Sequence, residues 1–520
     1  MATVTLTSYF ASLDGWQGQL LEASAGTVVN TRTSTTFAYT YPADHQFPGY
    51  KVTITGSGFT YDGTTPTGGT MNKIVITDNL GNPVITISGL AADTMASDLA
   101  LFASYSFGFE YPDGGGSGPQ TKSAWSLILS GNDVINGTAG DDYRGLPGMS
   151  AGNDTYNMKG GNDWVLGGMG NDTVNGGDGF DTFSFEETHY NEGMSATRGI
   201  NVNVATGTVI DAWGYTDKVT GIEQFIGSSY NDVFLGGASE DRFAGLRGID
   251  TFKGGSGGND WVVYDQDRWF GGLAGIVVDL SVTVSGGTIN GTIRDGFGNT
   301  DKTVNIESVA GTVYGDLFIG SSAQNNFAGG EGKDNYIGDG GADWVFLHWR
   351  FSDQVQTGVV VDLTRASGQI QNDGYGNVED AISIENIVGS SQNDKIKGSA
   401  DQNWIDGHDG KDTLTGAGGN DFFQFVDRNH FGDGDVITDF NAAAGANHDV
   451  LQIFVSNWGA TDTLNLVNGT AATGAFSTFI FNAANDTLYW DPDGTGAQAK
   501  IAVAVLTNVA SLSADDFDLV

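Results

Sequence analysis

Aspartate recurs at nearly constant spacing in four stretches of this chain, and it is the residue type most able to do chemistry here. Within a stretch, most steps between successive aspartates are 9 residues long. The residue two positions later is usually large and apolar, as Val165, Phe234 and Phe318 illustrate. Short carboxylates set among glycines suit a hard cation, because Ca²⁺ prefers oxygen ligands. The candidate metal ligands are Asp133, Asp142, Asp154, Asp163, Asp172, Asp181, Asp232, Asp241, Asp250, Asp260, Asp316, Asp334, Asp343, Asp394, Asp412 and Asp421.

The repeated pattern is G-G-x-G-x-D-x-U-x, where U is large and apolar, and it predicts a turn followed by a short strand. Glycine supplies the positive φ angles of the turn, and the strand points its central side chain inward. One repeat is then half a coil, so turns 18 residues apart stack at the strand spacing of ~4.8 Å. A cation between stacked turns would take a carboxylate from each, with turn carbonyls completing the six to eight oxygens of Ca²⁺. The tight octahedron of Mg²⁺ fits this arrangement less well.

This geometry predicts which aspartates pair. A flexible Gly/Asp-rich linker would not hold an apolar residue at a fixed offset, so we interpret the pattern as structural. Asn325 and Asn403 interrupt the series, and we expect weaker sites at their partners Asp343 and Asp421. The expected pairs are Asp154 with Asp172, Asp163 with Asp181, Asp232 with Asp250, Asp241 with Asp260, Asp316 with Asp334, and Asp394 with Asp412.

The first stretch departs from the pattern in two ways. Arg144 stands where an apolar residue belongs, and residues 146–151 are inserted. Asp133 and Asp142 are therefore less regular ligands than the others.

Three spacers between the stretches resemble one another and give the chain a longer period. They run over 199–232, 275–316 and 358–394, so each module of about 80 residues joins a strand-rich spacer to an aspartate stretch. The glutamate before each stretch could either bind metal or cap the next coil. The aromatic residue in each spacer turn could either pack on the edge of the coil or stay exposed for contact. These anchors are Glu223, Glu307 and Glu385, with Trp213, Phe297 and Tyr375, and with Gly214, Gly298 and Gly376.

The composition excludes several classes of protein. The 520 residues include 63 acidic and 22 basic side chains, which gives a net charge of −41. Such a chain is not a general nucleic-acid binder, because phosphate contacts need Lys and Arg, and it repels anionic membrane surfaces. With no cysteine, it has no disulfides, zinc thiolates or Fe–S clusters. No run of 18 apolar residues is present, so we expect no transmembrane helix.

Residues 1–125 carry no repeat and are expected to form a small β-rich domain. Residues 56–78 alternate like a hairpin, 92–105 is the one good helical stretch, and 111–120 resembles a linker. No H-E-x-x-H motif exists, and the two G-x-S-x-G matches (148–152 and 254–258) lie inside aspartate stretches, so no catalytic residue is assigned. His45 with Tyr50 could be imagined as a haem site, although a lone surface histidine explains it more simply.

From about residue 126 onward the chain resembles the RTX (repeats-in-toxin) proteins of the type I secretion class. The resemblance rests on the nonapeptides, on the spacers, on a cap-like segment at 430–454, and on 481–520, which is similar to an uncleaved secretion signal. It implies export through an ABC exporter. The first basic residue is Arg32, so we expect no N-terminal secretory signal peptide, in agreement with this route.

These observations predict an all-β fold, a parallel β-roll of calcium-binding repeats preceded by the small N-terminal domain. The function we expect is that of a secreted, calcium-binding surface-layer, matrix or adhesion scaffold, located outside the cell or on its surface. Its partners would be calcium, the exporter, and either further copies of itself or a cell-surface glycan or matrix. The alternative is a secreted hydrolase or haem-binding protein active in 1–125. The predicted boundaries are 1–125, 126–186, 187–264, 265–347, 348–429 and 430–520.

Overall fold

The regular elements of the described residues are almost all β-strands, and most of the strands run parallel in a β-roll, as the nonapeptide pattern predicts. The structure is a computed structural model that describes residues 3–6, 28–33, 35–40, 49–62, 65–88, 133–137, 142, 152–186, 196–284, 288–348, 355–426, 434–455 and 464–520. The expected helix (92–105) and linker (111–120) lie outside these residues. The chain divides into two compact units, Met1–Gly258 and Asn259–Val520. None of the helices in the described ranges has the length and hydropathy needed to cross a bilayer.

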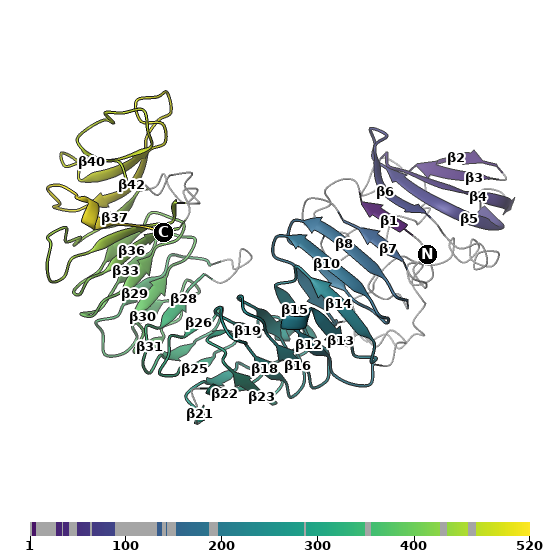
Figure 1. The fold of residues 1–520 in the computed structure, drawn as a ribbon, viewed down its shortest axis with the longest axis horizontal. Helices are drawn as coiled ribbons and strands as arrows, with labels where there is room; N and C mark the ends of the chain where they lie inside the picture. The colour runs from purple at the N-terminus through teal and green to yellow at the C-terminus, as the bar shows by residue number, and fades with distance from the viewer. Residues whose placement is uncertain are drawn as a thin grey trace. The chain divides into compact units, whose positions relative to one another are not determined.

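The first unit begins with an antiparallel meander in which β2 to β6 pair in chain order. The pairing of β4 with β5 confirms the hairpin expected over 56–78. β1 lies antiparallel to β6 on one side and parallel to β7, the first strand of the roll, on the other (Figure 1). The small β-rich domain is thus hydrogen-bonded to the first coil. The strands are β1 (Thr3–Leu6), β2 (Val28–Arg32), β3 (Thr36–Thr40), β4 (Lys51–Asp62), β5 (Thr65–Thr77), β6 (Pro83–Ser88) and β7 (Val134–Asn136).

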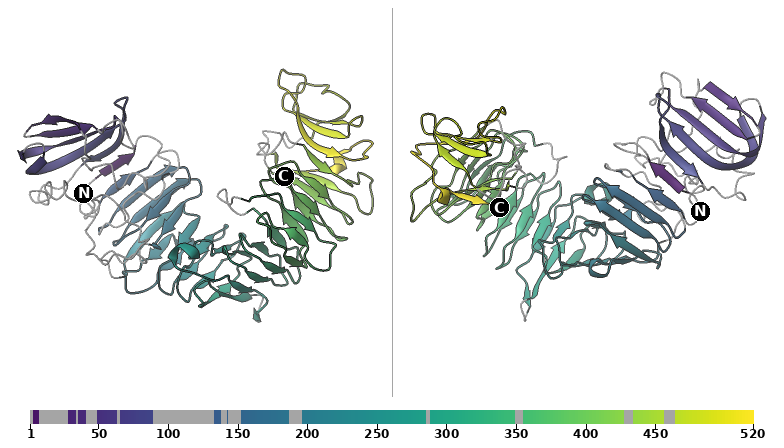
Figure 2. Two further views of the ribbon diagram at one scale, coloured as in Figure 1. Left: turned by 180° about the vertical axis from the view of Figure 1, so that it is seen from behind. Right: turned by 45° about the horizontal axis from the view of Figure 1, so that its top comes forward.

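The roll of the first unit has two faces, each a row of short parallel strands (Figure 1, Figure 2). Thr155 lies opposite Thr173, and Val165 lies opposite Phe183, so successive strands of one face are 18 residues apart, as expected. One face contains β8 (Thr155–Gly160), β10 (Thr173–Asp178), β14 (Thr216–Thr220), β16 (Val233–Leu235) and β18 (Thr251–Lys253), and the other contains β9 (Trp164–Leu166), β11 (Thr182–Ser184), β15 (Gln224–Ile226) and β17 (Arg242–Ala244).

The second unit repeats this plan. Phe318 lies opposite Tyr336, and Ile405 lies opposite Phe423, again 18 residues apart. One face contains β25 (Leu317–Ile319), β27 (Asn335–Ile337), β31 (Asp380–Ile382), β33 (Lys395–Lys397), β35 (Thr413–Thr415) and β37 (Asp435–Ile437). The other contains β19 (Trp261–Val263), β24 (Ser308–Ala310), β26 (Asn326–Ala328), β28 (Trp344–Phe346), β32 (Asn386–Val388), β34 (Trp404–Asp406), β36 (Phe422–Phe425), β38 (Val450–Ile453) and β43 (Phe517–Leu519).

Each spacer adds a strand that runs antiparallel to the coils. In the first spacer β12 (Asn201–Asn203) pairs with β13 (Thr208–Ile210), which pairs with β14. In the second, β20 (Val277–Asp279) pairs with β22 (Thr288–Arg294), which pairs with β21 (Thr283–Val284) and β23 (Thr300–Val304). In the third, β29 (Val360–Asp362) pairs with β30 (Ile370–Asn372). The glycines of the spacer turns, Gly214, Gly298 and Gly376, have φ angles of 102°, 91° and 99°, which explains why glycine recurs there.

The apolar residue of each repeat forms the core between the two faces. Phe234 stacks on Phe252 at 5.2 Å between ring centroids, and Phe318 stacks on Tyr336 at the same distance. All four side chains are at most 1 % exposed. Each such ring contributes roughly 1.5–3 kcal/mol of burial, so the core alone favours the coil register.

The C-terminal segment continues both faces of the second unit. β42 (Ile501–Leu506) pairs with β37 and begins a small sheet with β41 (Thr487–Asp491), β40 (Thr478–Asn482) and β39 (Leu466–Asn468). β43 extends the other face by pairing with β38. His448 Nε2 lies 2.8 Å from Asp516 Oδ1, which ties the two ends of the segment together. The short helical elements of the described residues are 3-10 turns: η2 (Val204–Thr206), η3 (Asp267–Phe270) and η5 (Ala514–Asp516).

The stacked turns predict an unequal response to Gly→Ala at two positions with positive φ. Gly332 has φ 115°, and a β-carbon there would overlap the carbonyl group of Tyr314 in the preceding coil; Gly445 has φ 134° and open space around it. Gly445→Ala should cost only the backbone strain of about 1–3 kcal/mol. Gly332→Ala should destabilise the protein further, because the coils must separate. Denaturant unfolding of both variants in saturating calcium checks this, and equal losses would contradict the stacking.

Candidate metal centre

The repeat aspartates form a ladder along each unit, defined here as the sixteen candidate ligands and the side chains that continue their spacing. All sixteen are at most 3 % exposed. One oxygen of each later carboxylate accepts the main-chain N–H of the aspartate one coil earlier. The expected pairs within a unit lie together in this way: Asp154 with Asp172 (2.7 Å), Asp163 with Asp181 (2.8 Å), Asp232 with Asp250 (2.7 Å), Asp316 with Asp334 (2.8 Å), and Asp394 with Asp412 (2.8 Å). The expected pair Asp241 with Asp260 has one member in each unit and stays a prediction.

The irregular first stretch belongs to the same ladder. The N–H of Asp133 donates to Asp154 Oδ1 and that of Asp142 to Asp163 Oδ1, both at 2.7 Å. These pairs are 21 residues apart rather than 18. The coil is therefore longer there, while the carboxylate keeps its place.

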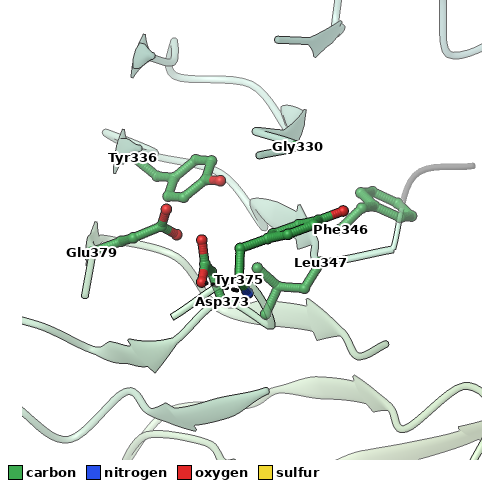
Figure 3. A pocket seen from close by; sticks show the side chains of 7 residues that line it. All are labelled: Gly330, Tyr336, Phe346, Leu347, Asp373, Tyr375 and Glu379. Atoms are coloured by element: carbon green, nitrogen blue, oxygen red, sulfur yellow. Dashed lines mark hydrogen bonds between the residues drawn. The ribbon is translucent and has the colours of Figure 1, made fainter. Parts of the chain in front are cut away.

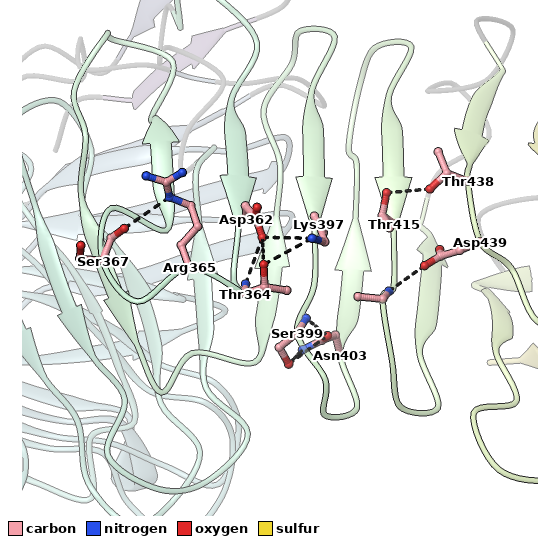
Figure 4. A network of polar contacts seen from close by, with 11 residues as sticks. Asp362, Thr364, Arg365, Ser367, Lys397, Ser399, Asn403, Thr415, Thr438 and Asp439 are labelled. Atoms are coloured by element: carbon pink, nitrogen blue, oxygen red, sulfur yellow. Dashed lines mark hydrogen bonds and ion pairs between the residues drawn. The ribbon is translucent and has the colours of Figure 1, made fainter.

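At the two interruptions an amide stands in the ladder. Asn325 donates its N–H to Asp343 Oδ1 at 2.8 Å, as an aspartate would, but its side-chain Nδ2 donates to the Glu307 carbonyl oxygen at 3.2 Å. Figure 4 shows the second case, Asn403, whose side-chain oxygen accepts the N–H of Ser399 at 2.7 Å. The amide nitrogen thus occupies a carbonyl oxygen that a cation could otherwise use. This supports the expectation of weaker sites at Asp343 and Asp421.

Side chains outside the repeats continue the ladder. The three spacer glutamates take the ladder position, since Glu223, Glu307 and Glu385 accept the N–H groups of Asp181, Asp260 and Asp343. Sequence reasoning missed four further members, which accept N–H groups of repeat aspartates in the same way: Asp217, Glu379, Asp435 and Asp449. Three of the four have an apolar residue two positions later (Val219, Ile437 and Leu451), so the D-x-U part of the pattern would have found them without its glycines.

The second oxygen of several ladder carboxylates is buried with no hydrogen-bond partner among the described residues. This holds for Asp172, Asp334, Asp343 and Asp412. Burial raises the pKa of Asp172 and Asp343 to about 7 and that of Asp412 to about 9, and neighbouring carboxylates add to the effect. Burying an ionised carboxylate without a counter-charge costs free energy of folding. A cation bound at these oxygens would remove that cost.

The repeat glycines keep β-carbons away from the ladder oxygens. A β-carbon on Gly311 would overlap Asp316 Oδ2 and would lie 2.9 Å from the Gly329 carbonyl oxygen of the next coil. Within the described ranges no three Asp, Glu or His side chains surround one point closely enough to bind a metal by themselves. A cation in the ladder would therefore need main-chain carbonyls beside its carboxylates, which suits the all-oxygen preference of Ca²⁺.

The first asparagine provides a test of the ladder. Asn325→Asp replaces the Nδ2 donor by a carboxylate oxygen one coil from Asp343, so it adds a ligand to the folded state. We expect the calcium concentration at the folding midpoint to fall, because binding to the folded state alone stabilises it. Asn393→Asp is the matched control. Asn393 is exposed, so this substitution adds the same negative charge outside the ladder. Circular dichroism against free calcium gives the midpoints, and an unchanged midpoint for Asn325→Asp would contradict the ladder.

The raised pKa values predict how calcium binding depends on pH. Asp172, Asp343 and Asp412 have folded pKa values above the unfolded value of about 3.9, so their protonation stabilises the metal-free fold at low pH. That contribution is lost as pH rises through about 7 to 9. Calcium must displace these protons, so its affinity should rise roughly tenfold or more between about pH 5.5 and 8. Calcium titrations at both pH values measure this, and equal affinities would show that the buried carboxyls are not its ligands.

The comparison with protein families agrees with this geometry. The family model of the RTX calcium-binding nonapeptide repeat (4 copies) matches residues 129–143, 150–183, 219–252, 311–345 and 388–423, which contain all the candidate aspartates except Asp260. The comparison with curated proteins gave no match. Among solved structures, the extracellular lipase LipA from Serratia marcescens aligns over 95 % of this chain and 83 % of its own, with 11 % identity and a TM-score of 0.20. The ladder and the family match together lead to one conclusion: the chain is an RTX-type repeat protein, and its nonapeptides are calcium-binding repeats.

Proposed function

We propose that the protein is a secreted extracellular scaffold that leaves the cell unfolded through a type I ABC exporter and folds when it meets calcium outside. The observation that carries this proposal is the ladder of buried carboxylates, because its charges oppose folding until cations bind between them. Residues 126–520 hold 54 acidic and 18 basic side chains, which adds repulsion throughout the roll.

The calcium requirement would keep the chain unfolded inside the cell and allow it to fold outside. Inside a cell, where free calcium is low, the glycine-rich turns lose backbone entropy on ordering without the gain from bound ions. Outside, calcium near millimolar concentration lies in the range in which extracellular modules bind. An unfolded chain can be threaded through an exporter, and a folded roll of stacked coils is a rigid extracellular element.

The meander of residues 1–125 is the part that we propose makes contacts. β1 and β6 cover the first strand of the roll, so the end of the roll is not a free edge on that side. β2 pairs only with β3 among the described strands, and such an edge is a template for pairing with another chain. We assign attachment to a cell surface, or assembly with further copies, to this domain.

Calcium-dependent attachment tests the function. The full-length protein should be largely unfolded in chelator, should fold cooperatively as calcium rises to about millimolar, and should then bind the producing cell's surface or associate with itself. Circular dichroism, light scattering and cell-binding assays measure the three steps.

A protein of residues 126–520 is the control. It should fold with calcium but should not attach to cells. Self-association is not a suitable measurement for this control, because loss of β1 uncovers β7, whose edge can pair with another chain. Cell attachment is therefore the property to measure. Full-length protein that stays monomeric and unattached in millimolar calcium would overturn the scaffold proposal, and equal circular dichroism with and without chelator would overturn the folding step.

A further inference from the structure

Two histidine rings lie in contact on the turns of the second unit, and neither belongs to the carboxylate ladder. His348 follows β28 and His408 follows β34. Their ring centroids are 4.5 Å apart, and the ring planes make an angle of 41°. β28 pairs with β32, and β32 pairs with β34, so the two rings come from coils that are not neighbours. They meet across the coil that lies between them.

The middle coil has a small side chain at this level. His348, Ser390 and His408 each stand three residues after the paired centre of their strand. Ser390 is fully buried, and its hydroxyl donates to Asp394 Oδ1 at 2.7 Å, so it is held within its own turn. A large side chain at this position would stand between the two imidazoles. The serine therefore permits the contact of the two rings.

The turn around His408 fixes the position of its ring. The φ angle of His408 is 64°, which is uncommon for a residue other than glycine, and its main-chain N–H donates to Asp406 Oδ1 at 2.8 Å. The Nδ1 atom of the ring lies 3.8 Å from Asp409 Oδ2. A carboxylate on that side of the imidazole favours a proton on Nδ1, which leaves the lone pair of Nε2 for a ligand.

The two rings are accessible from solvent at one edge only. The Nδ1 atoms of both rings are buried. The His408 side chain is nevertheless 21 % exposed, and His348 is partly exposed as well. Because Nδ1 is buried in both cases, Nε2 is the nitrogen of each ring that we assign to a ligand from solvent.

The cavity drawn in Figure 3 is a different place with different chemistry. Leu347, the residue before His348, lines it, but every polar side chain in its wall carries oxygen, as Tyr336 and Asp373 illustrate. It also adjoins the ladder, because Glu379 in its wall accepts the N–H of a repeat aspartate. The histidine pair provides nitrogen ligands instead.

We propose that His348 and His408 bind a transition-metal ion of the zinc type through the Nε2 atom of each ring. Imidazole nitrogen suits Zn²⁺, whereas Ca²⁺ takes oxygen ligands. No third Asp, Glu or His of the described residues joins the pair at one point, so water would complete the tetrahedral shell. Such an ion would link two coils whose strands, β28 and β34, are separated by β32.

A zinc titration of the full-length, calcium-saturated protein tests the site. Saturating calcium occupies the ladder, so zinc binding to its carboxylates is suppressed. The wild type should bind Zn²⁺, and His348→Gln and His408→Asn should each weaken the affinity at least about tenfold, because each removes one ligand. Asparagine is chosen at position 408 because it tolerates a positive φ angle. Isothermal titration calorimetry measures the affinities.

His448→Gln is the matched control. It removes an imidazole elsewhere in the same unit, where Nε2 already contacts Asp516 at 2.8 Å, so its zinc affinity should equal that of the wild type. Circular dichroism at saturating calcium verifies that each variant is folded. Cu²⁺ is a second probe, since its electron paramagnetic resonance spectrum in the wild type should show coupling to two imidazole nitrogens, and to one in each folded variant of the pair.

Three results would overturn the proposal. A wild-type protein that binds no zinc would show that the rings only stack. An affinity equal to that of the wild type in a folded His348→Gln or His408→Asn variant would place the zinc at other residues. Should neither variant fold, the copper spectrum of the wild type decides, and coupling to fewer than two nitrogens would count against the pair. None of these results bears on calcium-dependent folding or on attachment to cells.

Discussion

The structure depends on carboxylates that are buried one above another along the coils. A repeat aspartate cannot turn outward, because its Oδ1 accepts the N–H of the coil before it, as Asp172 does from Asp154. Each coil is thereby joined to the next by a bond that also brings like charges together. The same contact that sets the register therefore opposes folding unless a cation neutralises it, and this links calcium to the whole roll rather than to a local loop.

The spacers preserve this constraint where the nonapeptide pattern lapses. The first spacer places Asp217 after Asp172, and the third places Glu379 after Asp334, so the carboxylate series continues although the glycines are missing. On one face the antiparallel strand is inserted into the series: β13 lies between β12 and β14, and β22 lies between β20 and β23. The ladder restarts there, since the first aspartate after each spacer accepts the N–H of a spacer residue, as Asp232 does from Ile200. On the other face the spacer glutamates, such as Glu223 after Asp181, carry the ladder past the spacer.

Glycine and the inward apolar side chain have complementary roles in this design. The stack of Phe318 on Tyr336 gives the coils their hydrophobic attraction, and it does not require calcium. The turns contribute no such attraction. At a turn residue such as Gly311 the nearest groups are carbonyl and carboxylate oxygens, not apolar side chains. A core that favours collapse and turns that resist it are the physical basis of the calcium-dependent folding that we propose.

The sequence by itself determined the repeat, the 18-residue coil, the all-β class and the set of sixteen aspartates, because these follow from local spacing and from the inward position of every apolar partner such as Phe234. It did not reveal that Asp217, Glu379, Asp435 and Asp449 join the ladder, since they lack the glycines and their partners lie 23 to 45 positions away in the sequence. Nor did it decide between metal binding and capping for Glu223; the fold places that carboxylate in the ladder, next to Asp181. The pairing of β1 with both β6 and β7 was likewise set only by tertiary structure. Spacing within one repeat is a local property, whereas which carboxylates share a buried space depends on how distant segments stack.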